Sequence, residues 1–276
     1  MLDIIKLGCQ IPKILKINLH RLLKFLHSLN FPILKRLLPS LIKRTNILKN
    51  DQIIELDHFK IKINLAQSID REIYLNGFYE EKQISYLKKI CKKNKVTHFL
   101  DIGANIGYYT LQFKNINNIY AFEPNKYNFI KLKENINLNK LSVKSYNFGL
   151  SNINSISEIW YTDKNKMGGS AVYDQFDTEL KNYNYENIFK EKILLKKLDD
   201  LLDFKHLNIL IKIDVERHEK NVLEGMKNLI NQNNIILQIE IGDDLKKDVF
   251  FYLNKLNLKW INTIRHDHFF IKDLQI

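Results

Sequence analysis

A carboxylate next to a glycine-containing loop is the first feature of this 276-residue sequence that could do chemistry. Residues 99–107 read FLDIGANIG, so an apolar run ends in Asp101 and continues into a loop with Gly103 and Gly107. Glycine lets a backbone turn sharply and approach a bound molecule closely. The G-x-x-x-G spacing matches neither the dinucleotide fingerprint G-x-G-x-x-G nor a phosphate-binding loop, which ends in Gly-Lys-Ser or Gly-Lys-Thr. Asp101 would also repel a pyrophosphate, so the loop favours a cationic amino acid group that carries a sulfonium.

A second carboxylate follows at a distance that suits a nucleoside. Glu123 ends the next apolar run and precedes Pro124, 22 residues after Asp101. A carboxylate at the end of the second strand of such a fold can accept both hydroxyls of a ribose. Acids also cap the starts of helices, so either motif alone has a structural explanation. Together and in this order, the two motifs favour a nucleoside cofactor.

The densest group of titratable side chains follows a later apolar run. Asp214, Glu216 and Glu219 supply three carboxylates and His218 an imidazole within six residues. Glu240, near the end of the next apolar run, is expected beside them. Acids are favoured in the first turn of a helix by its dipole, which is the alternative explanation for Glu216 and Glu219.

Lys212 lies inside the apolar run that precedes Asp214. A buried ammonium group is costly unless it is paired, so Asp214 or Glu240 is its predicted partner. A divalent metal held by these two carboxylates is an alternative, because hard oxygen ligands suit Mg²⁺. The preferred prediction contains no metal.

These side chains can meet only if they stand at the ends of neighbouring parallel strands. Strands are expected at 97–102, 118–122, 143–148, 207–214 and 235–241. Helices are expected at 80–93, 106–113, 126–138, 218–231 and 245–256. An alternating stretch at 59–64 predicts a further strand, and runs at 260–264 and 268–271 predict a closing hairpin. The alternation predicts a doubly wound α/β fold, with a mostly parallel sheet and helices on both faces.

Residues 151–196 interrupt this alternation and are rich in aromatic side chains. The aromatic residues are Trp160, Tyr161, Tyr173, Phe176, Tyr183, Tyr185 and Phe189. Aromatic rings offer broad apolar area with a polar rim, so this insertion is a candidate for binding the acceptor of a reaction. A small structural layer of hairpins is the alternative.

The formal net charge of +12 is concentrated in the first fifty residues, which hold ten Lys or Arg and one acid, Asp3. The remaining 226 residues carry only +3. Leucines recur in the first fifty residues at helical spacing, between Pro12, Pro32 and Pro39. Residues 1–50 are therefore predicted to form short amphipathic helices. These helices would touch a membrane surface, or would pack on the main domain, residues 51–276, or on a partner subunit.

No run of 18 apolar residues predicts a transmembrane helix, and early lysines break up the apolar stretch that a secretory signal needs. Two cysteines are too few for a disulfide framework, which favours a reducing compartment. The sequence therefore predicts a cytoplasmic protein, with peripheral contact at the inner face of the membrane through residues 1–50 as an option.

Five segments, in their order and spacing, resemble the FkbM family of methyltransferases. They are DIGANIG at 101–107, FEPN at 122–125, GLSN at 149–152, IKIDVE at 211–216 with His218 and Glu219, and QIEI at 238–241. The resemblance covers roughly residues 79–271. It implies the class I methyltransferase fold, which is Rossmann-like with seven strands, the last one antiparallel. Arg217 departs from the family, which usually has Gly in Asp-Val-Glu-Gly-His-Glu, and a cation there could alter the loop or meet an anionic acceptor.

The resemblance also implies the cofactor S-adenosyl-L-methionine and O-methylation of hydroxyls, often on sugars or polyketides. Carried over, the cofactor-binding residues are Asp101, Gly103, Ala104, Asn105, Gly107, Glu123 and Pro124, with Asp214 beside the methyl group. Methyl transfer to an alcohol needs a base near neutral pKa. We expect His218 or Asp214 to be that base, with Glu240 or Glu216 orienting it.

The sequence thus predicts an S-adenosylmethionine-dependent O-methyltransferase, of class EC 2.1.1, acting on a sugar, a sugar nucleotide or a glycan, as in polysaccharide biosynthesis. A nucleic-acid-binding or RNA-modifying protein is the alternative, prompted by the basic residues 1–50. Those residues are leucine-rich with little aromatic interleaving, the rest of the chain is nearly neutral, and the Asn-Pro-Pro-Tyr signature is absent, so no nucleic-acid partner is expected. A non-catalytic, membrane-docked protein of the same fold is the third possibility.

Overall fold

The structure, a computed structural model, describes residues 51–161, 171–172 and 189–273 together with a few positions between 22 and 42. Contacts divide the chain into two compact units, Met1–Gln52 with Ile63–Tyr79 and Ile53–Lys62 with Glu80–Ile276. The second unit contains the large sheet. Most of residues 1–50 lies outside the described residues, so the predicted arm and its membrane contact stay predictions. No described helix is long and apolar enough to cross a membrane.

A seven-stranded sheet forms the centre of the second unit, in the order β12-β13-β11-β10-β3-β4-β5. The strands are β3 (His98–Ile102), β4 (Asn118–Phe122), β5 (Val143–Tyr146), β10 (Asn208–Ile213), β11 (Asn234–Glu240), β12 (Lys259–Ile264) and β13 (Asp267–Lys272). The strands β3, β4, β5, β10 and β11 are parallel, and β13 is antiparallel to both β11 and β12. This arrangement confirms the predicted fold class and its closing hairpin.

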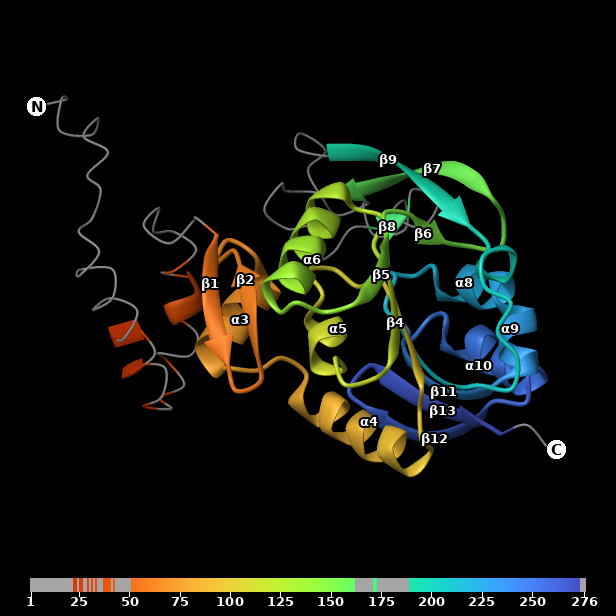
Figure 1. Ribbon diagram of the computed structural model, residues 1–276. Coiled ribbons are helices and arrows are strands. Elements are labelled where there is room, and N and C mark those ends of the chain that lie inside the picture. Colours follow the sequence, from red (N-terminus) through yellow and green to blue (C-terminus); the bar gives the residue numbers. More distant parts are fainter. Residues whose placement is uncertain are drawn as a thin grey trace, which may run out of the picture. The chain divides into compact units, whose positions relative to one another are not determined.

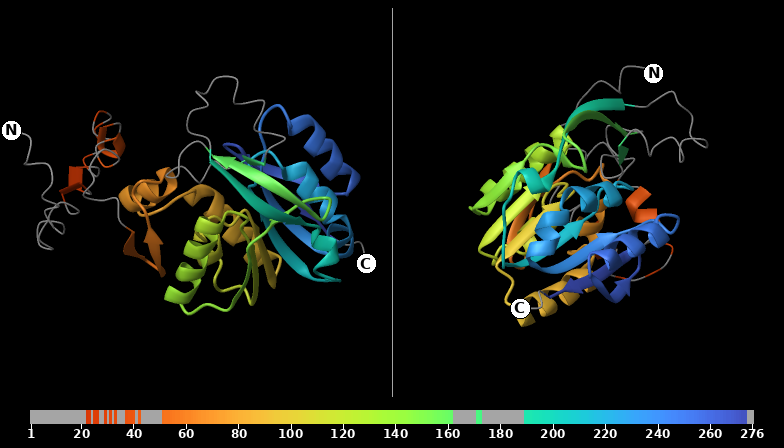
Figure 2. Two further views of the ribbon diagram at one scale, coloured as in Figure 1. Left: turned by 90° about the horizontal axis from the view of Figure 1, so that it is seen from above. Right: turned by 90° about the vertical axis from the view of Figure 1, so that its right-hand side faces the viewer.

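The strand order reverses between β3 and β10, and in open α/β sheets ligands bind beyond the carboxyl ends of the strands at such a switch point. On one face lie α4 (Glu81–Lys93), α5 (Tyr108–Gln112) and α6 (Lys126–Leu138), and on the other lie α8 (Glu219–Gly225), α9 (Lys227–Gln232) and α10 (Lys246–Lys255), as Figure 1 and Figure 2 show. The main core packs alternate residues of β10 and β11, such as Ile211 and Leu237, against α8 to α10. The other face is therefore free to carry polar side chains.

The helix predicted at 218–231 is divided into α8 and α9 at Met226. A Cβ at Gly225 would lie 1.9 Å from the carbonyl oxygen of Ser151, so this glycine packs directly on the chain that follows β6 (Gly149–Leu150). A side chain at that position would push the two segments apart. A helical sequence pattern does not carry this information, because the contact is with a segment more than 70 residues earlier in the chain.

Part of the predicted insertion forms a second sheet, in the order β6-β9-β7-β8. Its other strands are β7 (Ser155–Tyr161), β8 (Ala171–Val172) and β9 (Phe189–Lys196), and the pair β7–β9 is antiparallel. Ile159, Ile193 and Leu195 form its small core. The described strands thus form a small layer of strands, as the structural alternative for this insertion expected. Tyr173, Phe176, Tyr183 and Tyr185, which were candidates for binding an acceptor, lie outside the described residues.

The alternating stretch at 59–64 contains β2 (Phe59–Ile63), which pairs with β1 (Gln52–Leu56). The side chains of Asn135 in α6 and of Asn139, which caps the C-terminus of that helix, continue the hydrogen bonding of β2. The amide of Lys60 donates to Asn139 Oδ1 at 2.8 Å, and the amide of Lys62 donates to Asn135 Oδ1 at 2.6 Å. These asparagines act as backbone-like partners for the open edge of the hairpin.

In the first unit, α3 (Ser68–Asn76) follows β2 and was not predicted. It ends at Gly77, whose φ of +81° is the left-handed conformation that terminates many helices. The carboxylate of Asp70 accepts the amide of Asn64 at 2.6 Å and so fixes the approach to the helix.

Candidate active site

The register of the parallel strands aligns polar side chains into rows at the carboxyl end of the sheet. Asp101 of β3 pairs with Lys212 of β10, which in turn pairs with Gln238 of β11. Two residues further along, and therefore on the same face, come Asp214 and Glu240, and Glu240 pairs with Asp267 of β13. The opposite charges and amides of these six side chains meet at the switch point.

Lys212 is the central cation of this cluster. Its Nζ lies 3.0 Å from Asp214 Oδ2 and 3.4 Å from the carbonyl oxygen of Gly103. The side chain is buried and lies over the ring of Tyr109. Burial alone would lower the pKa of Lys212, but the charges of Asp214, Asp101 and Glu80 outweigh it and raise that pKa. The predicted pairing of Lys212 with Asp214 is confirmed.

Asp101 is completely buried at the end of β3. Its Oδ2 accepts the hydroxyl of Thr110 at 2.6 Å, whereas its Oδ1 accepts no hydrogen bond from the described residues. Burial raises the pKa of Asp101, and the charge of Lys212 opposes that rise. A buried acceptor without a donor is costly, so Asp101 Oδ1 is suited to a ligand that donates a hydrogen bond.

The glycine loop is shaped by its contact with β10. Gly103 has a φ of +78°, and a Cβ there would lie 1.8 Å from the carbonyl oxygen of Asp214. Gly107 starts α5 with a φ of +89°, and Ala104 packs in a small core with Leu132 of α6. The structure therefore explains these two glycines and Ala104 by backbone conformation and close packing around the site.

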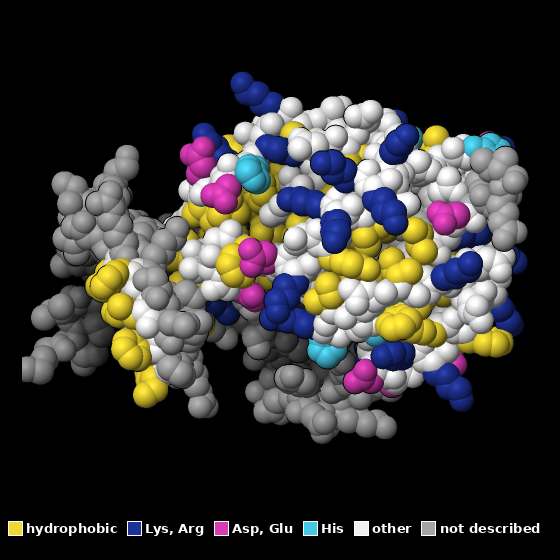
Figure 3. Space-filling model, turned by 90° about the horizontal axis from the view of Figure 1, so that it is seen from below, with side chains coloured by type: hydrophobic (Ala, Val, Ile, Leu, Met, Phe, Trp, Pro, Cys, Tyr) yellow, Lys and Arg dark blue, Asp and Glu magenta, His cyan; other side chains and the backbone are white. Residues whose placement is uncertain are grey.

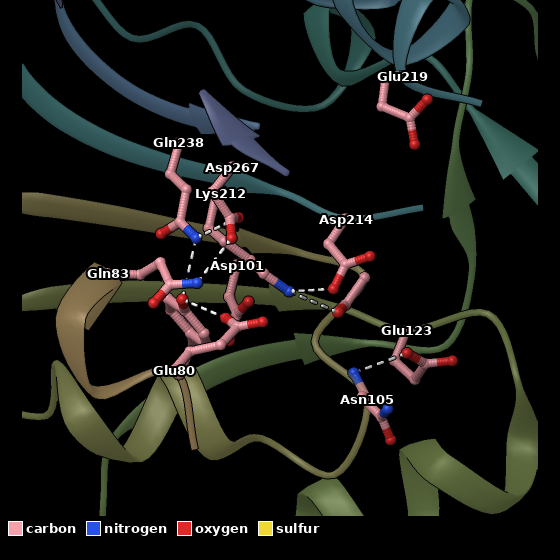
Figure 4. A network of polar contacts seen from close by, with 12 residues as sticks. Glu80, Gln83, Asp101, Asn105, Glu123, Lys212, Asp214, Glu219, Gln238 and Asp267 are labelled. Atoms are coloured by element: carbon pink, nitrogen blue, oxygen red, sulfur yellow. Dashed lines mark hydrogen bonds and ion pairs between the residues drawn. The ribbon is translucent and has the colours of Figure 1, made fainter. Parts of the chain in front are cut away.

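Glu123 lies at the end of β4 and is held by two backbone amides. Its Oε2 accepts the amide of Asn105 at 2.8 Å, and its Oε1 accepts the amide of Asn125 at 2.9 Å. Burial raises the pKa of Glu123 to about 7. The loop that follows Asp101 and the carboxylate of Glu123 are thus joined by a direct hydrogen bond (Figure 4).

A polar network that the sequence did not reveal adjoins the cluster (Figure 4). The hydroxyl of Tyr109 donates to Glu80 Oε2 at 2.5 Å and accepts from Gln238 Nε2 at 2.9 Å. Asp267 accepts from Gln238 at 2.6 Å and from Gln83 at 3.0 Å. Glu80 precedes α4 with a φ of +49°, an uncommon conformation for a residue other than glycine. The only sequence signal for Glu80 is its place at the start of a helix, which is equally expected of a capping acid.

Glu240 has the environment of a proton acceptor. Burial, followed by the negative charges of Asp214, Asp267 and Glu80, raises the pKa of Glu240 to about 8. It is only partly buried, at the end of β11. A carboxyl group with a raised pKa can take a proton from a substrate near neutral pH.

His218 and Glu219 face other parts of the molecule. His218 Nε2 lies 3.0 Å from Ser151 Oγ, and the imidazole is buried. Glu219 Oε1 accepts the amide of Arg217 at 2.9 Å in the first turn of α8, and Figure 4 shows Glu219 apart from the side chains around Lys212. Burial raises the pKa of Glu219 to about 7. The helix-start explanation offered for Glu219 therefore fits the geometry.

The turn after Asp214 is strained. Glu216 and Arg217 have φ values of +51° and +76° in succession. The guanidinium group of Arg217 forms an ion pair with Asp244, in the loop after β11. Among the described residues, no group of three or more His, Cys, Asp or Glu could hold a metal ion. The two-carboxylate metal alternative stays a prediction.

The family model described as the methyltransferase FkbM domain matches residues 101–267. Hexuronic acid methyltransferase AglP of Haloferax volcanii is 26% identical over 232 residues, which cover 83% of this chain and 90% of AglP.

Two solved structures resemble the fold. A methyltransferase FkbM from Methylobacillus flagellatus KT is 15% identical, with a TM-score of 0.41, over 64% of this chain and 44% of that chain. TYW2 of M. jannaschii in complex with AdoMet is 15% identical, with a TM-score of 0.40, over 81% of this chain and 84% of that chain. The present chain therefore spans less than half of the Methylobacillus chain.

Proposed function

Because this chain belongs to the FkbM methyltransferase family, whose domain model matches residues 101–267, we propose that it transfers a methyl group from S-adenosylmethionine to a hydroxyl of a sugar, a sugar nucleotide or a glycan. The observation that carries this proposal is the joined pair of cofactor loops, in which Glu123 accepts the amide of Asn105 beside Asp101. A sugar acceptor is supported by the 26% identity to a hexuronic acid methyltransferase.

The residues present fit this cofactor. Glu123 is a buried carboxylate at the end of the second parallel strand, where it would accept the ribose hydroxyls. Asp101 Oδ1 is a buried acceptor without a donor among the described residues, and it suits an ammonium group. The negative charges of Asp101 and Asp214 would together offset the desolvation cost of binding a cationic ligand. The bound cofactor supplies an electrophilic methyl carbon on a sulfonium.

The contribution of the chain is to orient the acceptor and remove its proton. Asp214 Oδ2 pairs with Lys212, and His218 Nε2 lies 3.0 Å from Ser151 Oγ, and these contacts favour another carboxylate over the two bases that the sequence suggested. Glu240 combines a raised pKa with partial exposure at the end of β11. We therefore assign the base to Glu240, with Asp214 beside it as the group that faces the methyl carbon. General base assistance of this kind is worth roughly 10²- to 10⁴-fold in rate.

The proposal is tested first by calorimetric titration with S-adenosylhomocysteine, with NAD as the comparison ligand. We expect micromolar binding of the former alone, lost in Asp101→Asn and weakened in Glu123→Gln. Binding would justify a screen of radiolabelled methyl transfer to uronic acids and sugar nucleotides. Binding of NAD in preference, or equal binding by both variants, would contradict the cofactor assignment.

A further inference from the structure

A hollow of about 840 Å³ lies at the edge of the sheet opposite the candidate active site. Three segments line it, namely the turn between β1 and β2, the C-terminal half of α4, and the loop from α5 to β4. Val96 and Ile116 of its lining precede β3 and β4, whose other ends carry Asp101 and Glu123. Five residues of strand separate the two edges by about 16 Å, so the hollow is distinct from the methyl-transfer site.

The floor of the hollow is apolar and its rim is basic. Buried side chains of Phe59, Cys91, Leu111 and Phe113 form the floor. Four lysines stand around it, Lys88, Lys92, Lys95 and Lys114, against a single acid, Asp57. Figure 3 shows this face, where Lys and Arg side chains gather around exposed apolar surface. A pocket of about 300–1,000 Å³ with an apolar lining and a few charged groups is the usual form of a small-molecule site.

The charges of these lysines are not compensated within the described residues. Lys88 Nζ lies 2.6 Å from the amide oxygen of Gln112, and Lys114 Nζ contacts the carbonyl oxygen of His58. Both partners are neutral, and none of the four lysines forms an ion pair with a carboxylate in the part of the chain that is described. Lys62 and Lys212, by contrast, each have a carboxylate at 3.0 Å. Two ammonium groups are thus oriented by the protein, and their charge remains available.

We propose that this hollow binds a phosphate-bearing ligand, with phosphate oxygens on Lys88 and Lys114 and an apolar or planar group on Phe59 and Phe113. Lysine binds phosphate as a point charge, and convergence of several lysines from separate segments gives an anion a favourable potential. The ligand is either a free nucleoside diphosphate or the headgroup of an anionic lipid, because both present the same phosphate chemistry.

The test is calorimetric titration of the full chain with inorganic pyrophosphate and with uridine diphosphate. The double variant Lys88→Gln, Lys114→Gln should weaken binding of both at least tenfold. The matched control Lys133→Gln, Lys220→Gln removes the same charge from exposed positions on α6 and α8 and should leave the affinity unchanged. Binding of S-adenosylhomocysteine to the first variant should be unaltered, which shows that it is folded and that the two sites are separate.

Vesicles of phosphatidylglycerol distinguish the source of the phosphate. Vesicle binding that the first variant loses and the control keeps, without binding of pyrophosphate or uridine diphosphate, assigns the lipid headgroup. Absence of binding to all three probes would overturn the proposal. Equal weakening in both double variants would also overturn it, because the interaction would then follow net charge alone.

Discussion

Glu191 accepts a hydrogen bond from Asn125 Nδ2 at 3.1 Å and so joins the second sheet to the cofactor loop. Its other oxygen accepts the amide of Lys126, at the first turn of α6, at 2.9 Å. Asn125 in turn donates its amide to Glu123 and accepts the amide of Asn128. A strand of the predicted insertion therefore supports the carboxylate assigned to the ribose, which makes Glu191 a positioning residue.

Substitution Glu191→Ala is expected to weaken S-adenosylhomocysteine binding about tenfold, because a charge-assisted hydrogen bond is worth roughly 1.5–3 kcal/mol. Glu191→Gln keeps one acceptor oxygen and should recover part of this loss. Isothermal titration calorimetry measures both values. Glu158→Ala, on the neighbouring strand β7, is the matched control and should bind normally. Equal affinity of Glu191→Ala and the wild type would show that Asn125 and Glu123 hold their positions alone.

Lys212 is expected to be the most costly charge to remove in the described part of the chain. The substitution Lys212→Met leaves the buried Asp101 and the partly buried Asp214 without their cation, and breaking a buried ion pair costs about 3–5 kcal/mol. Urea unfolding at pH 8 measures this loss. The loss should shrink at pH 5, because burial raises the pKa of Asp101 and its protonation removes part of the uncompensated negative charge.

Lys205→Met is the control for this substitution, because Lys205 also forms an ion pair at 2.9 Å, with Asp203, but both side chains are more than half exposed. Exposed pairs are worth about 0–1 kcal/mol. A loss for Lys212→Met no larger than that of the control would mean that the cluster tolerates an unpaired carboxylate.

We expect the protein with Arg217→Gly to be more stable than the protein with Arg217→Ala. Its φ of +76° is disfavoured for any side chain with a Cβ, and the cost is about 1–2 kcal/mol. Both Arg217→Gly and Arg217→Ala lose the ion pair with Asp244, so their difference isolates the backbone strain. In thermal and urea unfolding, the free energy of unfolding of Arg217→Gly should exceed that of Arg217→Ala by about 1 kcal/mol. Equal stabilities would show that the loop relaxes to another conformation.

The sheet could be predicted because its strands carry strong local signals. Buried apolar runs such as 97–102 and 118–122 alternate with helical patterns, and short runs at 260–264 and 268–271 identified the closing hairpin. The proximity of the loops with Asp101 and Glu123 could then be predicted as well, because the carboxyl ends of neighbouring parallel strands lie at the same edge of the sheet. Local sequence therefore carries both the elements and the cofactor motifs.

The pairing of Lys212 with Asp214 could be predicted, but the adjoining network of Glu80, Gln83, Tyr109 and Asp267 could not, because it depends on register between distant segments. Asp267 and Gln83 are 184 residues apart and meet only when β13 is inserted antiparallel beside β11. The orientation of His218 toward Ser151 likewise depends on the packing of α8 against the chain after β6. An imidazole among carboxylates looks catalytic in sequence, but its neighbours in the chain are not its neighbours in space.

The assignment of the base to Glu240 predicts a specific pH dependence. The carboxylate is the active form and the pKa of Glu240 is raised to about 8, so kcat/KM should rise about tenfold per pH unit below pH 8 and level off above it. Glu240→Gln should abolish this rise of kcat/KM below pH 8, and it should lower the rate roughly 10²- to 10⁴-fold. His218→Gln should keep the rise of kcat/KM below pH 8. If this rise persists in Glu240→Gln and is lost in His218→Gln, His218 is the base and the assignment to Glu240 is wrong.

Titration of Glu240 should also change the free energy of unfolding, and this change can be measured without substrate. A carboxyl whose folded pKa exceeds its ordinary value binds its proton more tightly when folded, so folding is favoured at low pH. The free energy of unfolding should therefore fall as the pH rises from about 4.5 to about 8, the interval between the ordinary and the raised pKa of Glu240. Glu240→Gln should flatten this fall, as measured by urea unfolding at several pH values. Glu72→Gln, at an exposed position of α3, is the matched control and should leave the slope unchanged, because the predicted slope comes from the partly buried Glu240 carboxyl and the like charges around it.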